Sequence, residues 1–190
     1  MGIAIAEALA DGGAQVTLVL GPSHLHTHKA GIQTINVESA EEMYNACTAA
    51  FSDTDIAVLS AAVADYKPAN KASEKIKKQG DTLDIQLVKN KDILATLGSS
   101  KKAGQLLVGF ALETTNELNH ALDKMNRKNA DMIVLNSLKD AGAGFGHDTN
   151  KVTLIDKQGT QQELPLQSKQ AVADAIVTRI TELIHAEKAV

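Results

Sequence analysis

Aromatic residues are scarce in this sequence, and tryptophan is absent. Phenylalanine and tyrosine together make up 3% of the 190 residues. Proteins that stack nucleic-acid bases or dock peptides in grooves rely on aromatic surfaces, so the composition disfavours both classes. The formal net charge of −4 argues against a general binder of nucleic acids or membrane surfaces. Any anionic ligand must therefore be bound by a local group of cations.

The sequence has a single cysteine and no long apolar run. Cys47 is the single cysteine, so an internal disulfide is excluded and a reducing compartment is favoured. No apolar run approaches the roughly 20 residues that a membrane-spanning helix needs. The first residues lack the basic segment of a secretory signal. These absences predict a cytoplasmic protein without a membrane anchor.

Helical and strand patterns alternate along the chain. Five helices are expected. The first covers residues 2–9 and is ended by Gly12-Gly13, and the second begins at Ser39, which forms a capping box with Glu42. Of the others, one begins near Asp92, one runs through 118–125, and one begins at Ser168. Apolar strands are expected at 14–22, 33–37, 55–64, 105–112 and 131–136, an edge strand at 81–89, and a hairpin at 150–166. The order predicts one α/β domain over residues 1–190. We expect a Rossmann-like, mostly parallel sheet with helices on both faces and a C-terminal antiparallel hairpin.

The predicted order begins with a helix. In doubly wound sheets a central strand and a glycine-rich phosphate loop usually precede the first helix. The expectation is therefore a domain that is N-terminally incomplete, with a fold that simply starts on a helix as the alternative.

Candidate ligand-binding residues follow the predicted strands. Ala61 to Asp65, Gly109 to Ala111 and Asn136 each fall at a strand end, and 88–94 starts a short helix. The first strand end leads into five lysines: Lys67, Lys71, Lys75, Lys77 and Lys78. Lysines beside a strand-end carboxylate suit a polyphosphate with its divalent cation. Asp65 is then a candidate ligand for the metal or for a sugar hydroxyl, and the sequence does not rank the two.

Six segments carry a family resemblance. "AAVADYKP", "EKIKK", "VKNKDIL", "VGFALET", "RKNADMIVLN" and "GFGHDTNKVTLI" occur in the order and spacing of bacterial phosphopantothenate–cysteine ligases. The chain resembles this family over essentially all of its length.

The resemblance implies a set of site residues. Lys75 matches a phosphate-contacting lysine with a catalytic role. A nucleotide site is implied at Ala61, Asp65, Lys75, Asn90, Lys91, Asp92, Ile93, Phe110, Lys124 and Lys128. Asn136 matches a strand-end asparagine that we assign to substrate binding, and Asp65 is the candidate ligand for Mg²⁺.

The resemblance also implies a reaction. Family members use CTP with Mg²⁺ or Mn²⁺ to join 4′-phosphopantothenate to cysteine in coenzyme A biosynthesis, through an acyl-cytidylate. It implies a homodimer, no flavin in this domain, and a flavin-dependent decarboxylase domain as a possible upstream neighbour. Two alternatives stand beside it. One is a truncated nucleotide-binding remnant, and the other is a nicotinamide-dependent oxidoreductase, which would need a G-x-G-x-x-G turn and a Tyr-x-x-x-Lys pair that the sequence lacks.

Overall fold

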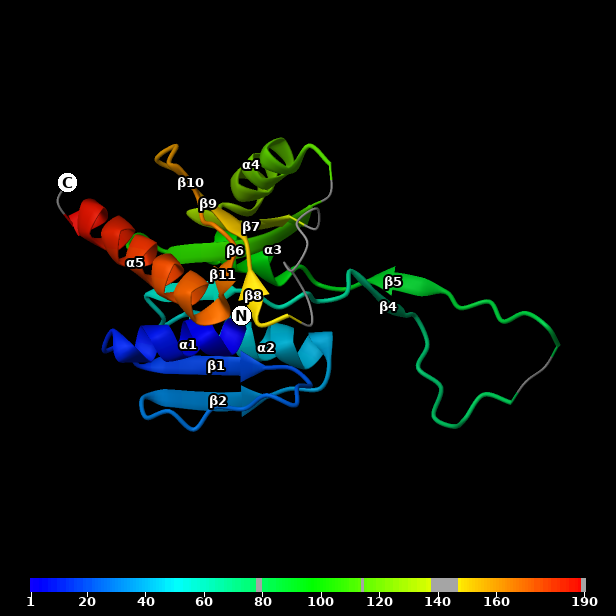
Figure 1. Ribbon diagram of the computed structural model, residues 1–190. Coiled ribbons are helices and arrows are strands. Elements are labelled where there is room, and N and C mark those ends of the chain that lie inside the picture. The colour runs from blue at the N-terminus through cyan, green and yellow to red at the C-terminus, as the bar shows by residue number, and fades with distance from the viewer. Residues whose placement is uncertain (78–79, 114, 138–146, 189–190) are drawn as a thin grey trace.

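The chain forms a sheet covered by helices, with a long arm projecting from one side (Figure 1). The computed structural model describes residues 1–77, 80–113, 115–137 and 147–188. The helices are α1 (Gly2–Asp11), α2 (Ala40–Phe51), α3 (Ile93–Ser100), α4 (Glu117–Lys128) and α5 (Lys169–Lys188). The strands are β1 (Val16–Leu20), β2 (Ile32–Asn36), β3 (Ile56–Leu59), β4 (Tyr66–Pro68), β5 (Leu87–Lys89), β6 (Leu106–Glu113), β7 (Met132–Ser137), β8 (Thr149–Asn150), β9 (Val152–Asp156), β10 (Gln161–Glu163) and β11 (Gln167–Ser168).

The main sheet has five strands in the order β10-β9-β7-β6-β3. Strands β3, β6 and β7 run parallel, whereas β9 and β10 form the antiparallel hairpin. The predicted α/β fold and its C-terminal hairpin are therefore confirmed. The sheet is nevertheless divided, because β1 and β2 form a separate parallel pair within the described part of the chain.

Alternating side chains of the main sheet pack into two cores. Even-numbered residues of β6 and β7, such as Val108 and Val134, pack with α1 and α5. Odd-numbered residues, such as Leu107 and Ile133, pack with α2, α3 and α4. All four of these residues are fully buried. Because successive side chains of a strand point to opposite faces, one apolar run serves both cores.

Local signals in the sequence place several element ends correctly. Ser39 accepts a hydrogen bond from the Glu42 amide, and the Glu42 carboxylate accepts from the Ser39 amide, so the predicted capping box is present. Helix α1 ends before Gly13, whose φ of +89° lies in the region that favours glycine.

Two strand predictions were wrong in extent. The run at 55–64 forms a strand only at Ile56–Leu59, and its residues are half-buried rather than buried on both sides. The reason is that β3 is the edge strand of the main sheet and, among the described strands, pairs with β6 alone. Within 81–89, only Leu87–Lys89 forms a strand, because its partner β4 pairs over just three residues.

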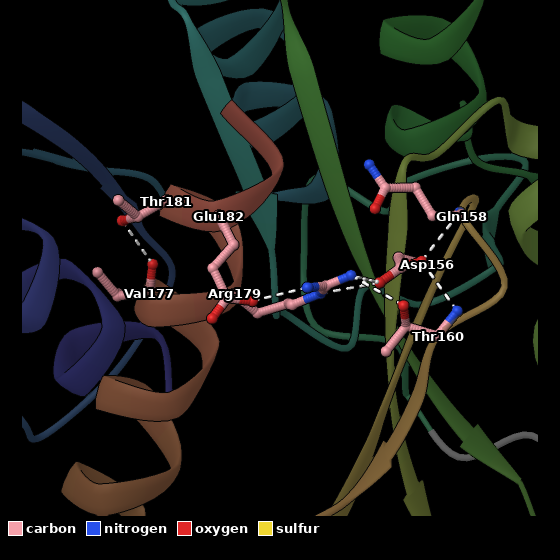
Figure 2. A network of polar contacts seen from close by, with 7 residues as sticks. All are labelled: Asp156, Gln158, Thr160, Val177, Arg179, Thr181 and Glu182. Atoms are coloured by element: carbon pink, nitrogen blue, oxygen red, sulfur yellow. Dashed lines mark hydrogen bonds and ion pairs between the residues drawn. The ribbon is translucent and has the colours of Figure 1, made fainter. Parts of the chain in front are cut away.

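The C-terminal hairpin is joined to α5 by a buried ion pair (Figure 2). The side chain of Asp156 is 2% exposed, and Arg179 donates to its Oδ2 from Nη2 at 2.6 Å and from Nε at 2.9 Å. The other oxygen, Oδ1, accepts from the backbone amides of Gln158 and Thr160. This carboxylate therefore shapes the hairpin turn and anchors the helix that covers one face of the sheet.

Among the described residues, no helix combines the length and apolarity needed to cross a membrane.

Candidate functional site

The candidate site lies at the carboxyl edge of the main sheet. Pairing of β3 with β6 stops at Leu59 and Gly109, whereas β6 remains paired with β7 as far as Glu113 and Ser137. Beyond Gly109, β6 has no strand partner on its β3 side in the described sheet. The chain leaves β3 at this point through residues 60–65. Ligands of open α/β sheets bind at this edge, and the structure gathers most of the predicted site residues there.

Lys124 reaches the edge from α4. Its Nζ donates a 2.8 Å hydrogen bond to the backbone oxygen of Phe110. Burial lowers the pKa of Lys124, and the nearby Lys128 lowers it further, whereas carboxylates, chiefly Glu113, oppose the shift. The net result is a lowered pKa, which means that burying the charged ammonium group reduces the stability of the folded state.

Asp92 connects two helices at the same edge. As the N-cap of α3, its Oδ1 accepts from the Ala95 amide at 2.9 Å. Its Oδ2 accepts from Lys128 Nζ at 2.6 Å. Partial burial raises the pKa of Asp92, but the hydrogen bonds from Lys128 and Ala95 outweigh it and the net shift is downward. The carboxylate is therefore held in its charged form beside two lysines.

The crossing of α3 and α4 depends on Gly98 and Asn129. A Cβ on Gly98 would collide with the carbonyl oxygen of Lys128, so the two helices could not approach this closely with any other residue there. Asn129 ends α4 in the left-handed conformation, with φ +49°, and its Nδ2 donates to the Gly98 oxygen at 2.9 Å. This contact fixes the end of α4 and hence where Lys128 meets Asp92.

Residues 66–77 and 80–89, which we call the lysine arm, project from this edge. Strands β4 and β5 pair at its base (Figure 1). Asn90 closes the base: its amide donates to the Asp65 oxygen and its Nδ2 donates to the Ala64 oxygen, both at 2.8 Å. The predicted nucleotide-site residue Asn90 thus also shapes the loop that carries Asp65.

Helix α2 braces the base of the arm. Lys67 Nζ lies 2.9 Å from Glu41 Oε2, and Lys91 Nζ lies 4.5 Å from the centre of the Tyr44 ring. Glu41 and Tyr44 are three residues apart on α2, so both lysines contact the same side of this helix. The side chain of Lys91 therefore already has a partner within the protein.

Lys75 is the one predicted site residue that lies within the lysine arm. Lys75 is exposed in the arm, which points away from the helices (Figure 1). It makes no hydrogen bond or ion pair with any residue that the structure describes. Its ammonium group is therefore available to an external anion.

Phe110 and Asn136 approach the edge from the other face of the sheet. The ring of Phe110 packs against the core formed with α1 and α5, and the register of β6 and β7 puts Asn136 on that face as well. Asn136 Oδ1 is buried and has no hydrogen-bond partner among the described residues. Buried polar atoms are normally paired, so this oxygen is suited to accept from a ligand.

Ile93 and Ala61, two further predicted nucleotide-site residues, differ in exposure. The side chain of Ile93 is buried in the core with α2 and α4, so only its backbone can contact a ligand. Ala61 is exposed in the loop after β3.

Sequence reasoning missed one polar pair at this edge. His120 Nδ1 lies 3.3 Å from Glu113 Oε2, with His120 in the first turn of α4 and Glu113 at the end of β6. The spacing could have indicated it, because His120, Lys124 and Lys128 are four residues apart and therefore share one face of a helix.

A protein-held metal centre is not evident in the described residues, which contain no group of three or more His, Cys, Asp or Glu side chains. Mg²⁺ commonly binds through substrate phosphates and one or two carboxylates while keeping several waters. The exposed Asp65 fits that mode, with the phosphates as the main ligands.

Comparison with known proteins relates nearly all of the chain to one family. A model of the DNA/pantothenate metabolism flavoprotein C-terminal domain matches residues 1–184. A protein named cysteine/cysteine sulfinic acid decarboxylase, from an unknown prokaryotic organism, is 51% identical over 97% of this chain and 52% of its own length. The coenzyme A biosynthesis bifunctional protein CoaBC of Vibrio cholerae is 45% identical over 96% of this chain and 46% of its own length.

The chain thus spans about half the length of these relatives. A crystal structure of the C-terminal domain of a CoaBC protein superposes with a TM-score of 0.81 at 39% identity, covering 97% of this chain and 82% of that one. A Streptococcus pneumoniae flavoprotein structure, 19% identical with a TM-score of 0.77, supports the same fold.

Proposed function

Because this chain belongs to the DNA/pantothenate metabolism flavoprotein C-terminal domain family, we propose that it ligates 4′-phosphopantothenate to cysteine at the expense of CTP. The observation that carries the proposal is the gathering of Lys124, Lys128 and Asp92 at the carboxyl edge of the sheet, in a chain that is acidic overall. Two lysines on successive turns of α4 form the local cationic site that an acidic protein needs for a triphosphate.

The proposed reaction has two steps. The carboxylate of 4′-phosphopantothenate attacks the α-phosphorus of CTP, forming an acyl-cytidylate and releasing pyrophosphate. The amine of cysteine then attacks the acyl carbon, the bond to the phosphate oxygen breaks, and CMP leaves. The substrates supply both nucleophiles, so catalysis consists mainly of positioning and of stabilising charge.

Each part of the edge has a role in this proposal. Lys124 and Lys128 bind phosphate oxygens, and the backbone of residues 61–65 and 90–93 reads the base and ribose. The unpaired Oδ1 of Asn136 accepts a hydrogen bond from the acyl substrate. Mg²⁺ or Mn²⁺, held by the phosphates and Asp65, would neutralise charge on the triphosphate.

The lysine arm supplies Lys75. Because the arm extends away from the helices (Figure 1), Lys75 would contact phosphates only when the arm folds over the site. Its ammonium group would then bind the charged groups of the acyl-cytidylate while cysteine attacks.

The arm also supports a homodimer. Leu83, Ile85 and Leu87 alternate along the arm with exposed fractions of 63%, 57% and 54%. An exposed apolar segment beside a short two-stranded ribbon is suited to pair with a second copy of itself. Light scattering after size exclusion tests this. L83S/I85S/L87S should be monomeric, whereas L25S, which alters a leucine 70% exposed outside the arm, should leave a dimer. A wild-type monomer would contradict the dimer.

Nucleotide choice tests the proposed function directly. Calorimetric titration in Mg²⁺ should show tighter binding of CTP than of ATP, because backbone groups near residues 61 and 90–93 read the smaller base. Equal or tighter binding of ATP would contradict the CTP-dependent assignment.

A further inference from the structure

Three residues of α4 form a stripe that faces the carboxyl edge. His120, Lys124 and Lys128 are spaced four residues apart and therefore lie one above another on one side of the helix. Lys124 contacts the backbone of β6 and Lys128 contacts the N-cap of α3, which fixes the direction of the stripe. His120 contacts Glu113 at the end of β6, so it belongs to the same side of the site.

The contact with Glu113 selects one form of the imidazole. A charged carboxylate only accepts hydrogen bonds, so His120 Nδ1, at 3.3 Å from Glu113 Oε2, must carry the proton. In the neutral ring, Nε2 then has a free lone pair. The side chain of Glu113 is 26% exposed and that of His120 is 47% exposed, so the carboxylate is the more enclosed partner and the ring reaches solvent.

The second step of the proposed reaction needs a proton acceptor. Cysteine carries its amine as an ammonium ion at neutral pH, and an ammonium nitrogen has no lone pair with which to attack. The side chains of Lys124 and Lys128 are assigned to phosphate oxygens in the proposed function, so neither is placed to serve as the acceptor. A histidine, with an ordinary pKa near 6.5, is the side chain suited to this transfer.

We propose that His120, oriented by Glu113, accepts the proton of the cysteine ammonium before attack on the acyl-cytidylate; this inference rests on the proposed function. One ammonium proton moves to Nε2, and the nitrogen lone pair forms the bond to the acyl carbon. The bond to the CMP oxygen then breaks with its electron pair, and the second proton leaves the nitrogen for that phosphate or for water. Glu113 stabilises the imidazolium that results.

Charged groups surround the pair on several elements. Glu113 faces His120 from β6, Glu117 and Lys124 lie on α4, and Asp92 and Asp65 act on Lys124 from α3 and from the loop after β3. These charges influence how the rate of the second step depends on pH. The pH–rate profile of wild type should therefore be compared with those of variants and not with the titration of free histidine.

The experiment separates the two steps. Pyrophosphate release is measured with CTP, Mg²⁺ and 4′-phosphopantothenate alone, and CMP release is then followed after addition of cysteine. In H120N, pyrophosphate release should stay within about twofold of wild type, whereas the cysteine step at pH 7 should fall about 100-fold. E113Q should show a smaller loss in the same step, and H185N, on α5, should behave like wild type.

Replacing cysteine with hydroxylamine distinguishes a proton acceptor from a residue that only maintains the structure of the site. Hydroxylamine is unprotonated at neutral pH and needs no base, so H120N should form the hydroxamate at the wild-type rate. The loss with cysteine should also shrink as pH rises toward the pKa of the cysteine amine.

Three results would overturn the inference. An unchanged cysteine step in H120N would exclude His120 as the acceptor, and an equal loss with hydroxylamine would show a structural role instead. Absence of pyrophosphate release from the wild-type protein would instead overturn the proposed function, and this inference with it.

Discussion

Lys128 Nζ lies 2.6 Å from Asp92 Oδ2, which joins the last turn of α4 to the first turn of α3. The side chains are 21% and 50% exposed, so the pair is expected to contribute no more than about 1 kcal/mol to stability. The pair has a larger effect on where Lys128 lies, because it holds this lysine, which is proposed to bind phosphate, beside the segment proposed to read the nucleotide.

Substitutions at Asp92 should separate capping from charge. D92S keeps an oxygen that can cap α3, so it should lose only the ion pair, whereas D92A loses both and should cost about 1 kcal/mol more. Urea unfolding at pH 7 measures this difference, and calorimetry should show weaker CTP binding in both variants. Equal stability of D92S and D92A would contradict the capping role.

The same pair predicts a dependence of stability on acid. The folded state lowers the pKa of Asp92, so its contribution is present above the ordinary carboxylate pKa of about 3.9 and is lost as pH falls through the lower folded value. The stability difference between wild type and D92S should therefore shrink between pH 5 and pH 2. A constant difference over that range would show that the charge of Asp92 does not stabilise the fold.

Gly98 should not tolerate alanine. Gly→Ala inside a helix normally stabilises by up to about 1 kcal/mol. Here the added methyl group would meet the Lys128 carbonyl, and the resulting shift should cost on the order of 1–3 kcal/mol. S99A, one residue along α3 and exposed, is the matched control for thermal unfolding. A G98A protein as stable as S99A would show that the helices do not need this close approach.

Lys124 should show a conflict between stability and binding. Because burial lowers its pKa, the unfolded chain binds this proton more tightly, and stability rises with pH between the folded and unfolded pKa values. K124M removes that cost, so its melting temperature should not fall and its stability should rise less between pH 8 and pH 10. CTP affinity should fall at least tenfold. Unchanged CTP affinity in K124M would remove Lys124 from the nucleotide site.

Lys75 should matter to turnover and not to folding. It is exposed and makes no contact with the described residues, so K75Q should change stability by less than about 0.5 kcal/mol. CMP release in the presence of cysteine should nevertheless fall by orders of magnitude. K71Q, in the same arm, is the control and should remain active; equal losses in both variants would indicate a general charge effect of the arm.

Patterns with local causes were predictable from the sequence. The capping box at Ser39, the stop at Gly13 and the hairpin near Gly159 each follow from the chemistry of a few neighbouring residues. The spacing of Lys124 and Lys128 also placed both lysines on one helix face. Their assignment to one site with Asp92 came from the family resemblance.

Features that depend on distant contacts were not predictable. The apolar run at 55–64 gives no sign that β3 lies at a sheet edge, because edge and central strands can share the same composition. The close approach at Gly98 could be predicted only if the position of α4 relative to α3 were known. The pairing of His120 with Glu113 likewise depends on where β6 ends relative to α4. The placement of Lys75 depends on how far the arm extends, which the lysine spacing does not encode.

Product analysis tests the ligase assignment most directly. The protein is incubated with CTP, Mg²⁺, 4′-phosphopantothenate and cysteine, and products are quantified by mass spectrometry. We expect 4′-phosphopantothenoylcysteine, CMP and pyrophosphate in equal amounts, with none of them formed when CTP is omitted. Nucleotide binding without amide formation, or release of CMP without the amide, would contradict it.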